Sequence, residues 1–254
     1  MAAAIGAGEW PYPYWIAHRG AGKQAPENTL AAFRLGAAHG WRMFECDAKL
    51  SADGVPFLLH DSALERTTDG TGTAGNLPWA ELSRRDAGSW HSRGHAGEPL
   101  PTLENAARFC LRNGYHLNIE IKPTPGTEGP TGEAVAALAA RLWADEAVPP
   151  LLTSFKPASL DGARRAAPDL PRGLLLDTLR EGWLGEAQAL GCVAVVCQHT
   201  LWTQEAVDAT HRAGMKALCY TVNDPESAAR LGQFGVDGII SDRIELFAPA
   251  ARPA

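Results

Sequence analysis

Residues 43–60 read MFECDAKLSADGVPFLLH, and they decide which fold the sequence specifies. Two short apolar runs, 43–50 and 55–59, are joined by only four residues, 51–54. A parallel crossover needs a dozen residues or more, so these runs must be antiparallel. Asp53-Gly54 closes the link, and Asp-Gly between apolar runs is a strong hairpin signal because both central positions need a positive φ. The second run is therefore predicted to be the returning arm of a hairpin.

Outside this hairpin, short apolar runs alternate with stretches long enough for helices, a pattern typical of an α/β protein with a parallel sheet. Without the returning arm, eight runs remain, the number that a barrel needs. We predict one α/β domain over residues 1–254, a (β/α)8 TIM barrel, with a doubly wound open sheet as the alternative. The eight runs are 15–17, 43–50, 117–121, 151–155, 173–176, 193–197, 217–222 and 238–241, and the predicted helices include 27–39, 132–143, 203–213 and 225–233.

The segment that follows the hairpin lacks this alternation. Residues 69–76 and 89–101 are rich in Gly, Ser, Asp and Pro, which favour turns. We therefore predict that residues 48–101 form a small insertion after the second strand, placed on one end of the barrel.

The composition is that of a soluble globular protein. The chain has 254 residues, 45% hydrophobic and 20% charged, with a formal net charge of −6. This acidic balance argues against a general nucleic-acid partner, and no apolar run reaches the roughly 18 residues of a membrane span. The N-terminal residues do not resemble a secretory signal, and an odd number of cysteines indicates reduced, buried thiols. We expect a cytoplasmic protein; the cysteines are Cys46, Cys110, Cys192, Cys197 and Cys219.

Acidic side chains lie where two predicted strands approach their carboxyl ends, the end at which TIM barrels build active sites. Because side chains alternate along a strand, Glu45 and Asp47 share one face, and Glu120 and Lys122 share another. Three convergent carboxylates beside one lysine carry too much negative charge to lie buried alone. Oxygen ligands favour a hard divalent cation, Mg²⁺, Ca²⁺ or Mn²⁺, over zinc.

Two histidines are predicted to flank these carboxylates. His18 follows the first strand, and a two-residue turn at Asp53-Gly54 would place His60 opposite Asp47, with Cβ atoms about 4.5–5.5 Å apart. A slip of one residue would turn His60 to the other face. Imidazole titrates near neutral pH, so this pair suits general acid–base catalysis.

Arg19 and Lys122 supply the charge and the donors that a phosphate group needs. Together with a metal and two histidines, these cations suit hydrolysis of a phosphate ester, in which the metal polarises the phosphoryl oxygen.

The chain resembles the glycerophosphodiester phosphodiesterase family, and above all its cytoplasmic bacterial members associated with glycerol-3-phosphate uptake. The similarity extends from about residue 10 to about residue 247. The resemblance implies a TIM barrel with a small insertion, one divalent cation and hydrolysis of deacylated phospholipids to sn-glycerol 3-phosphate and an alcohol. It is carried by His18-Arg19-Gly20, Pro26-Glu27-Asn28-Thr29, Glu45-Cys46-Asp47, His60-Asp61, Glu120-Ile121-Lys122-Pro123 and Tyr220-Thr221-Val222-Asn223.

The resemblance also implies residue roles. The catalytic pair is His18 and His60, the metal ligands are Glu45, Asp47 and Glu120, and the phosphate is held by Arg19 and Lys122. Phe155 and Tyr220 end strands and are candidates for contact with the glycerol moiety or for packing at the rim. Two departures from the family pattern are Tyr220, where Trp is common, and Arg243 after Asp242, where Pro often follows.

Several alternatives stay open at this point. The acids could be paired with Arg19 and Lys122 without a metal. The function could be that of a phospholipase-type phosphodiesterase with a similar barrel, or of a non-catalytic phosphodiester-binding protein. The preferred head group, the nucleophile (water or a glycerol hydroxyl), the identities of the acid and the base and the oligomeric state do not follow from the sequence.

Overall fold

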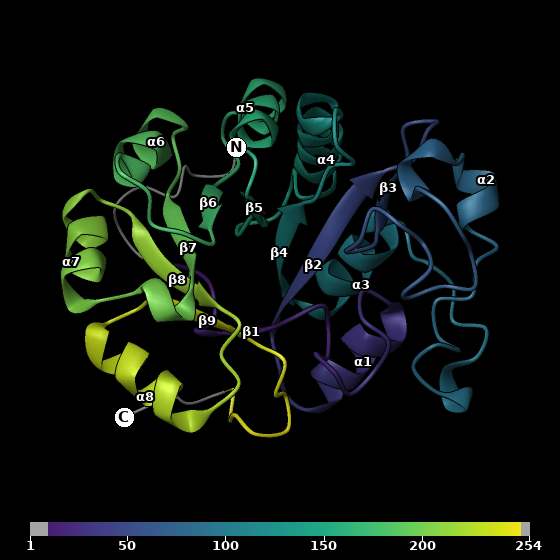
Figure 1. The fold of residues 1–254 in the computed structure, drawn as a ribbon, viewed down its shortest axis with the longest axis horizontal. Coiled ribbons are helices and arrows are strands. Elements are labelled where there is room, and N and C mark those ends of the chain that lie inside the picture. The colour runs from purple at the N-terminus through teal and green to yellow at the C-terminus, as the bar shows by residue number, and fades with distance from the viewer. Residues whose placement is uncertain (1–9, 250–254) are drawn as a thin grey trace.

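The computed structural model describes residues 10–249, and these form a barrel of strands surrounded by helices (Figure 1). Eight strands are parallel and hydrogen-bonded in the order β1-β9-β8-β7-β6-β5-β4-β2, and pairing of β1 with β2 closes the ring. The predicted TIM barrel is confirmed. The strands are β1 (Trp15–Ala17), β2 (Met43–Leu50), β3 (Pro56–Leu58), β4 (His116–Ile121), β5 (Leu151–Ser154), β6 (Arg172–Leu176), β7 (Ala194–Gln198), β8 (Lys216–Tyr220) and β9 (Gly238–Ser241).

The helices cover the outside of the barrel, and the four predicted ones are present as α1, α4, α7 and α8. Helix α1 begins three residues later than predicted because Thr29 caps it, accepting a hydrogen bond from the Ala32 N–H. The helices are α1 (Leu30–Ala38), α2 (Trp79–Leu82), α3 (Leu103–Asn113), α4 (Glu128–Leu142), α5 (Pro157–Ala166), α6 (Trp183–Ala189), α7 (Gln204–Arg212) and α8 (Pro225–Phe234), with short 3₁₀ turns at Ala74–Asn76, Arg93–His95 and His199–Leu201.

Strand alternation divides the apolar core into an inner and an outer part. Inside the barrel, Ile16, Met43 and Val196 belong to one buried cluster. A larger cluster, which includes Phe44 and Cys46, packs the outer face of the strands against the helices. The five cysteines are free and buried, as the sequence predicts. The inner cluster leaves the carboxyl ends of β2 and β4 to polar side chains, and these form the site described below.

The hairpin is present, but its turn differs from the predicted one. Strand β3 runs antiparallel to β2, with Ala48 opposite Leu58. The Ser51 N–H donates to the Val55 carbonyl at 3.0 Å. The loop therefore has three residues, 52–54, and Gly54 takes the left-handed conformation with φ 84°.

This turn shifts the register by one residue, so the predicted pairing of His60 with Asp47 is wrong. The residue opposite Asp47 is Leu59, whose N–H donates to the Asp47 carbonyl at 3.0 Å. The cause is local: the Asp53 carboxylate accepts a hydrogen bond from the Ser51 hydroxyl at 2.6 Å, which favours the longer loop. His60 still reaches the site, because the chain leaves the sheet after β3 instead of continuing as a strand.

The segment between β3 and α3 lies beside β2, on the right of Figure 1. A small apolar cluster packs this segment against β3: Phe57 of β3 and Leu64 and Leu82 of the segment are fully buried in it. The segment also contacts the helices around the barrel: the Ala31 N–H of α1 donates a hydrogen bond to Glu98 Oε1 at 3.0 Å. The treatment of residues 48–101 as an insertion stays a prediction, and β2 itself continues to Leu50.

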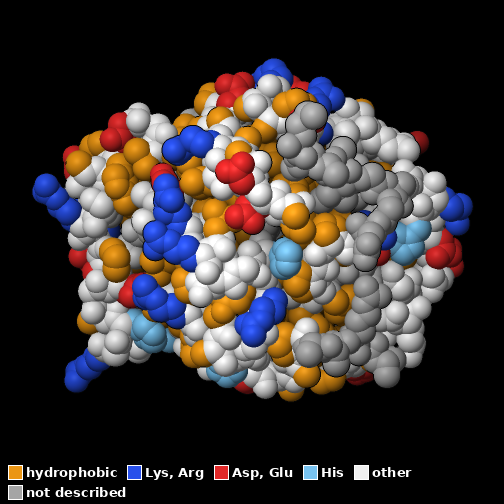
Figure 2. Space-filling model, turned by 180° about the vertical axis from the view of Figure 1, so that it is seen from behind, with side chains coloured by type: hydrophobic (Ala, Val, Ile, Leu, Met, Phe, Trp, Pro, Cys, Tyr) orange, Lys and Arg blue, Asp and Glu red, His pale blue; other side chains and the backbone are white. Residues whose placement is uncertain are grey.

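Figure 2 shows the face opposite to that in Figure 1, where basic, acidic and apolar side chains lie side by side. Among residues 10–249, no helix has the length and the apolar character that crossing a membrane requires.

Candidate active site

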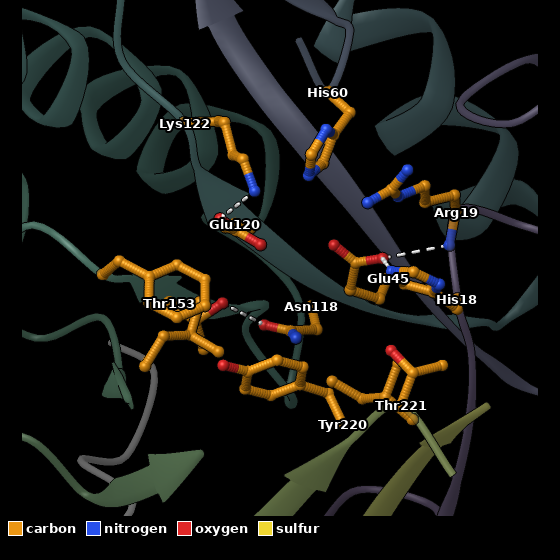
Figure 3. A pocket seen from close by; sticks show the side chains of 13 residues that line it. His18, Arg19, Glu45, His60, Asn118, Glu120, Lys122, Thr153, Tyr220 and Thr221 are labelled. Atoms are coloured by element: carbon orange, nitrogen blue, oxygen red, sulfur yellow. Dashed lines mark hydrogen bonds and ion pairs between the residues drawn. The ribbon is translucent and has the colours of Figure 1, made fainter. Parts of the chain in front are cut away.

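Three carboxylates meet at the carboxyl ends of two adjacent strands. Glu45 and Asp47 come from β2 and Glu120 comes from β4, where it lies opposite Asp47 in the parallel register. One oxygen from each residue lies within 4.8 Å of the others, and all three residues are buried. Figure 3 shows Glu45 and Glu120 facing each other, with His18 and His60 approaching from different sides. The convergence predicted from strand alternation is therefore present.

Burial and the mutual repulsion of the carboxylates raise the pKa values of two members of this cluster. Burial, followed by the charge of Asp47, raises the pKa of Glu120 to about 7. The same two causes raise the pKa of Glu45 well above its usual value. The pKa of Asp47 is lowered: burial acts in the opposite direction, but the charges of Arg19 and Lys122 outweigh it. The cluster therefore disfavours full ionisation unless further positive charge is bound.

Arg19 and Lys122 contact these carboxylates directly. The Arg19 Nε lies 3.2 Å from Asp47 Oδ2, and the Lys122 Nζ lies 2.8 Å from Glu120 Oε1 and 3.4 Å from Asp47 Oδ1. Glu45 accepts the backbone N–H of Arg19 at 3.0 Å. The buried Asp47 Oδ1 has no hydrogen-bond partner among the described residues. Side-chain pairing thus leaves part of the charge unmatched, and the oxygen donors present fit a hard divalent cation.

Asn28, from the Pro-Glu-Asn-Thr motif, holds Asp47 in place. Its Nδ2 donates to Asp47 Oδ2 at 2.8 Å, and the Asp47 N–H donates to Asn28 Oδ1 at 3.0 Å. The Asn28 N–H also donates to the Arg19 carbonyl at 3.0 Å. Both Arg19 and Asn28 have positive φ, 50° and 60°, a conformation that non-glycine residues adopt rarely. The loop after β1 is therefore built tightly around the site.

His18 is oriented by an acid from the last strand end. Its Nδ1 lies 2.6 Å from Asp242 Oδ1, and its Nε2 lies 3.9 Å from Glu45 Oε2. Asp242 is fixed in turn by Asn223, whose Nδ2 donates to Asp242 Oδ2 at 2.9 Å. The sequence analysis did not assign these two supporting residues. The available signal was that β9 neighbours β1 in a closed barrel, so that their ends must meet.

His60 is oriented in the same way by its sequence neighbour. Its Nδ1 lies 2.7 Å from Asp61 Oδ1. Arg66 donates to Asp61 Oδ2 at 2.5 Å and to both carboxylate oxygens of Glu27. Glu27 also accepts from Arg19 at 2.8 Å. A continuous chain of ion pairs therefore links His60 to Arg19.

The charges in this chain shift two pKa values. The hydrogen bond from Arg66 is the main cause that lowers the pKa of Asp61 to about 2. Burial lowers the pKa of His60 below its usual value, and the cations Arg19 and Lys122 act in the same direction. The charge of Asp47 and the hydrogen bond to Asp61 act in the opposite direction, but the net effect disfavours the imidazolium form of His60.

These residues surround a cavity of about 210 Å³. One wall is aromatic: the rings of Phe155 and Tyr220 meet edge to face with centroids 5.7 Å apart, and the Tyr220 hydroxyl donates to the Leu176 carbonyl at 3.0 Å. Each predicted site residue lines the cavity except Asp47, which is fully buried. The lining is formed by His18, Arg19, Glu45, His60, Asn118, Glu120, Lys122, Thr153, Phe155, Leu175, Tyr220, Thr221 and Ile240.

Asn118 and Thr153 are lining residues that the sequence analysis missed. Asn118 lies two positions before Glu120 on the same face of β4, so alternation alone could have placed it. Its Oδ1 accepts a hydrogen bond from the Thr153 hydroxyl of β5 at 3.0 Å.

Residues 18–246 match the sequence profile of the glycerophosphoryl diester phosphodiesterase family. The chain belongs to this family. The glycerophosphodiester phosphodiesterase of Caldanaerobacter subterraneus subsp. tengcongensis is 33% identical over 234 residues, which cover 89% of this chain and 93% of the relative. The Bacillus subtilis protein YhdW is 33% identical over 237 residues, or 90% of this chain and 94% of that protein.

Solved structures agree with this family membership. The phosphodiesterase of Oleispira antarctica, solved in complex with the product sn-glycerol-3-phosphate, has a TM-score of 0.85 and 35% identity. The match covers 91% of this chain and 93% of that chain. The family, its relatives and this likeness identify the chain as a glycerophosphodiester phosphodiesterase, a hydrolase of phosphoric diesters.

Proposed function

We propose that this phosphodiesterase hydrolyses deacylated phospholipids to sn-glycerol 3-phosphate and an alcohol, with one divalent cation and two histidines. One observation carries the proposal: the carboxylate cluster, two basic side chains and two histidines meet at a single cavity. Each histidine is hydrogen-bonded to a carboxylate of its own. The Oleispira antarctica enzyme, with its bound product, supports the same substrate class.

Glu45, Asp47 and Glu120 would hold the cation, and their oxygen donors favour Mg²⁺ or Ca²⁺, with Mn²⁺ as a further candidate. When bound, such an ion supplies Lewis-acid polarisation of a phosphoryl oxygen. The raised pKa values of Glu45 and Glu120 support this role, because positive charge is what the cluster lacks.

Arg19 and Lys122 bind the phosphate through charged N–H donors that project into the cavity. His18 and His60 move the protons. A carboxylate at Nδ1 of each ring keeps that nitrogen protonated, which leaves Nε2 to accept or donate a proton. One imidazole takes the proton of the nucleophile, either water or a glycerol hydroxyl, and the other protonates the leaving alkoxide.

Phe155 and Tyr220 form the wall against which we place the glycerol moiety. The carbon-bound face of glycerol suits an aromatic wall, while its hydroxyls suit the polar groups opposite. A cytoplasmic location is part of the proposal and is supported by five buried, free thiols, which a reducing compartment preserves.

The test is an assay of the purified protein with glycerophosphocholine and glycerophosphoethanolamine, with and without EDTA, that measures released glycerol 3-phosphate. We expect release that EDTA abolishes and that added Mg²⁺, Ca²⁺ or Mn²⁺ restores. His18→Ala and His60→Ala should each lower kcat at least about a hundredfold.

Each other result points to a different reading. Turnover that resists EDTA would favour the metal-free, ion-paired cluster. Activity on phospholipid vesicles but not on the soluble diesters would favour a phospholipase-type enzyme. Binding of the diesters without any turnover would refute catalysis.

A further inference from the structure

A second cavity, of about 330 Å³, adjoins the catalytic cavity. Glu120, Lys122 and Phe155 line both of them, so the two cavities meet beside the predicted phosphate-binding lysine. The second cavity is also lined by Lys156 and Asp177. We infer that it is the subsite for the leaving alcohol, and that Asp177 selects alcohols that carry a cationic nitrogen. This inference rests on the proposed function.

The shape of a phosphodiester supports the assignment of this cavity to the leaving alcohol. A phosphodiester has two arms that diverge from one phosphorus atom. With the phosphate at Lys122 and the glycerol arm against the wall of the first cavity, the other arm needs space that opens from the same lysine. Among the cavities found in residues 10–249, the second one meets that condition through its shared residues.

The backbone next to Asp177 is fixed by a hydrogen bond between Tyr220 and the preceding residue, Leu176. Asp177 directly follows Leu176, the last residue of β6, whose carbonyl accepts the Tyr220 hydroxyl at 3.0 Å. After burial, the charge of Asp177 is the next cause that raises the pKa of Tyr220, so the carboxylate lies near the phenol ring. The backbone is thus anchored where the two cavities meet.

The Asp177 carboxylate is available to a ligand. It is exposed, and no hydrogen bond or ion pair joins it to another residue in the described part of the chain. Phe155, which lines the same cavity, already has a cation near its ring, since the Lys122 Nζ lies 5.6 Å from the centroid. A free carboxylate next to aromatic rings is a chemical setting that attracts ammonium groups.

Two lysines, Lys122 and Lys156, also line the second cavity, and their positive charges would repel a cationic head group unless they are paired or lie in solvent. Lys122 is paired with Glu120 and Asp47 and would bind the phosphate. Lys156 is exposed, and its charge is felt by Glu128 at the start of α4. Of the two acids that line this cavity, Glu120 is paired with Lys122, which leaves Asp177 to attract a cation. Lys156 lines the same cavity with a positive charge, so a variant at this position is a matched control for a variant at Asp177.

The test compares kcat/KM for two cationic-headed substrates, glycerophosphocholine and glycerophosphoethanolamine, with two neutral-headed ones, glycerophosphoglycerol and glycerophosphoinositol. In Asp177→Asn we expect a loss of about three- to tenfold for the cationic pair and none for the neutral pair. In Lys156→Gln the cationic pair should be unchanged or turned over faster. High salt should reduce the preference of the wild type and leave Asp177→Asn unaffected.

An equal loss for all four substrates in Asp177→Asn, or no loss at all, would overturn the subsite while the proposed function stands. A wild-type protein that turns over none of the four would overturn the proposed function and the subsite together.

Discussion

Asn28 and Asp47 are joined by two hydrogen bonds that run in opposite directions. The amide Nδ2 of Asn28 donates to the Asp47 carboxylate at 2.8 Å, and the Asp47 backbone N–H donates back to Asn28 Oδ1 at 3.0 Å. Asn28 is buried and left-handed, with φ 60°, a conformation that asparagine tolerates better than most residues. One side chain thus ties the loop after β1 to the carboxylate cluster.

Replacing Asn28 with alanine should therefore damage the site. The buried Asp47 N–H loses its partner inside the protein, and Asp47 Oδ2 keeps only its contact with the Arg19 Nε. The unsatisfied N–H costs about 1–3 kcal/mol of unfolding free energy. If Asp47 holds the proposed cation, we expect kcat to fall about tenfold to a hundredfold, the usual loss when a residue that orients a metal ligand is removed. Urea unfolding and steady-state kinetics measure the two effects. Asn113→Ala, on the exposed end of α3, is the control, and equal losses in both variants would contradict the role of Asn28.

Arg66 should matter for turnover more than for stability. It bridges Glu27 and Asp61, the acids that hold Arg19 and His60. Its side chain is 44% exposed, so the pairs should add little to folding. Arg66→Gln should lower kcat about tenfold to a hundredfold through misplaced groups, with a small change in unfolding free energy.

Two further variants sharpen the Arg66 test. Arg66→Lys should restore only part of the activity, because lysine lacks the planar fork that binds two carboxylates. Arg108→Gln removes a surface pair with Glu104 on α3 and should leave kcat unchanged. Wild-type turnover in Arg66→Gln would show that the ion-pair chain is dispensable.

The pKa of His60 should lie below 6.5, because burial disfavours the imidazolium. The folded protein then binds fewer protons than the unfolded chain below pH 6.5, so this group makes folding less stable as pH falls through that range. Asp61 acts the other way, since its hydrogen bond favours the imidazolium. Asp61→Asn should therefore lower the pKa of His60 further, as measured by NMR titration of the ring. In Asp242→Asn, which alters the partner of His18, the His60 titration should stay in place, and a rise in Asp61→Asn would refute the assignment.

Gly22 and Gly114 form a matched pair of left-handed glycines, with φ 58° and 65°. Alanine at either position carries a conformational cost of about 1–2 kcal/mol. At Gly114 the new Cβ would have no atom within 4 Å, whereas at Gly22 it would lie 2.0 Å from the carbonyl oxygen of Asp242. Gly22→Ala should thus displace the acid that orients His18, losing more stability than Gly114→Ala and at least about tenfold in kcat. Similar kinetics in the two variants would argue against this contact.

Features with a fixed period or a hard length limit could be predicted from the sequence. Alternation placed Glu45, Asp47 and Glu120 on inward faces, and the four-residue link after Leu50 forced an antiparallel arm. The register of that arm could not be predicted from Asp-Gly alone. It depends on the side chain of Asp53, which accepts hydrogen bonds from the Ser51 hydroxyl and from the Trp79 N–H.

Partners that are far apart in the sequence were missed. Asp242 meets His18 across 224 positions, and Arg66 meets Glu27 across 39. Neither contact has a periodic signature in the chain. Both depend on how the barrel closes and on how the segment after β3 folds back, which are properties of the tertiary structure.

His18 and His60, the proposed catalytic pair, are attached to parts of the fold that differ in how many strands support them. His18 directly follows β1, a strand of the closed ring. His60 follows β3, which stands outside that ring and is held by β2 and by an isolated bridge from Phe57 to Thr102. Local detachment of this arm on warming would switch off turnover while the ring, with its acidic cluster, stays folded. Thermal inactivation should then precede the melting of the barrel, so a melting curve alone would overstate the working range of the enzyme.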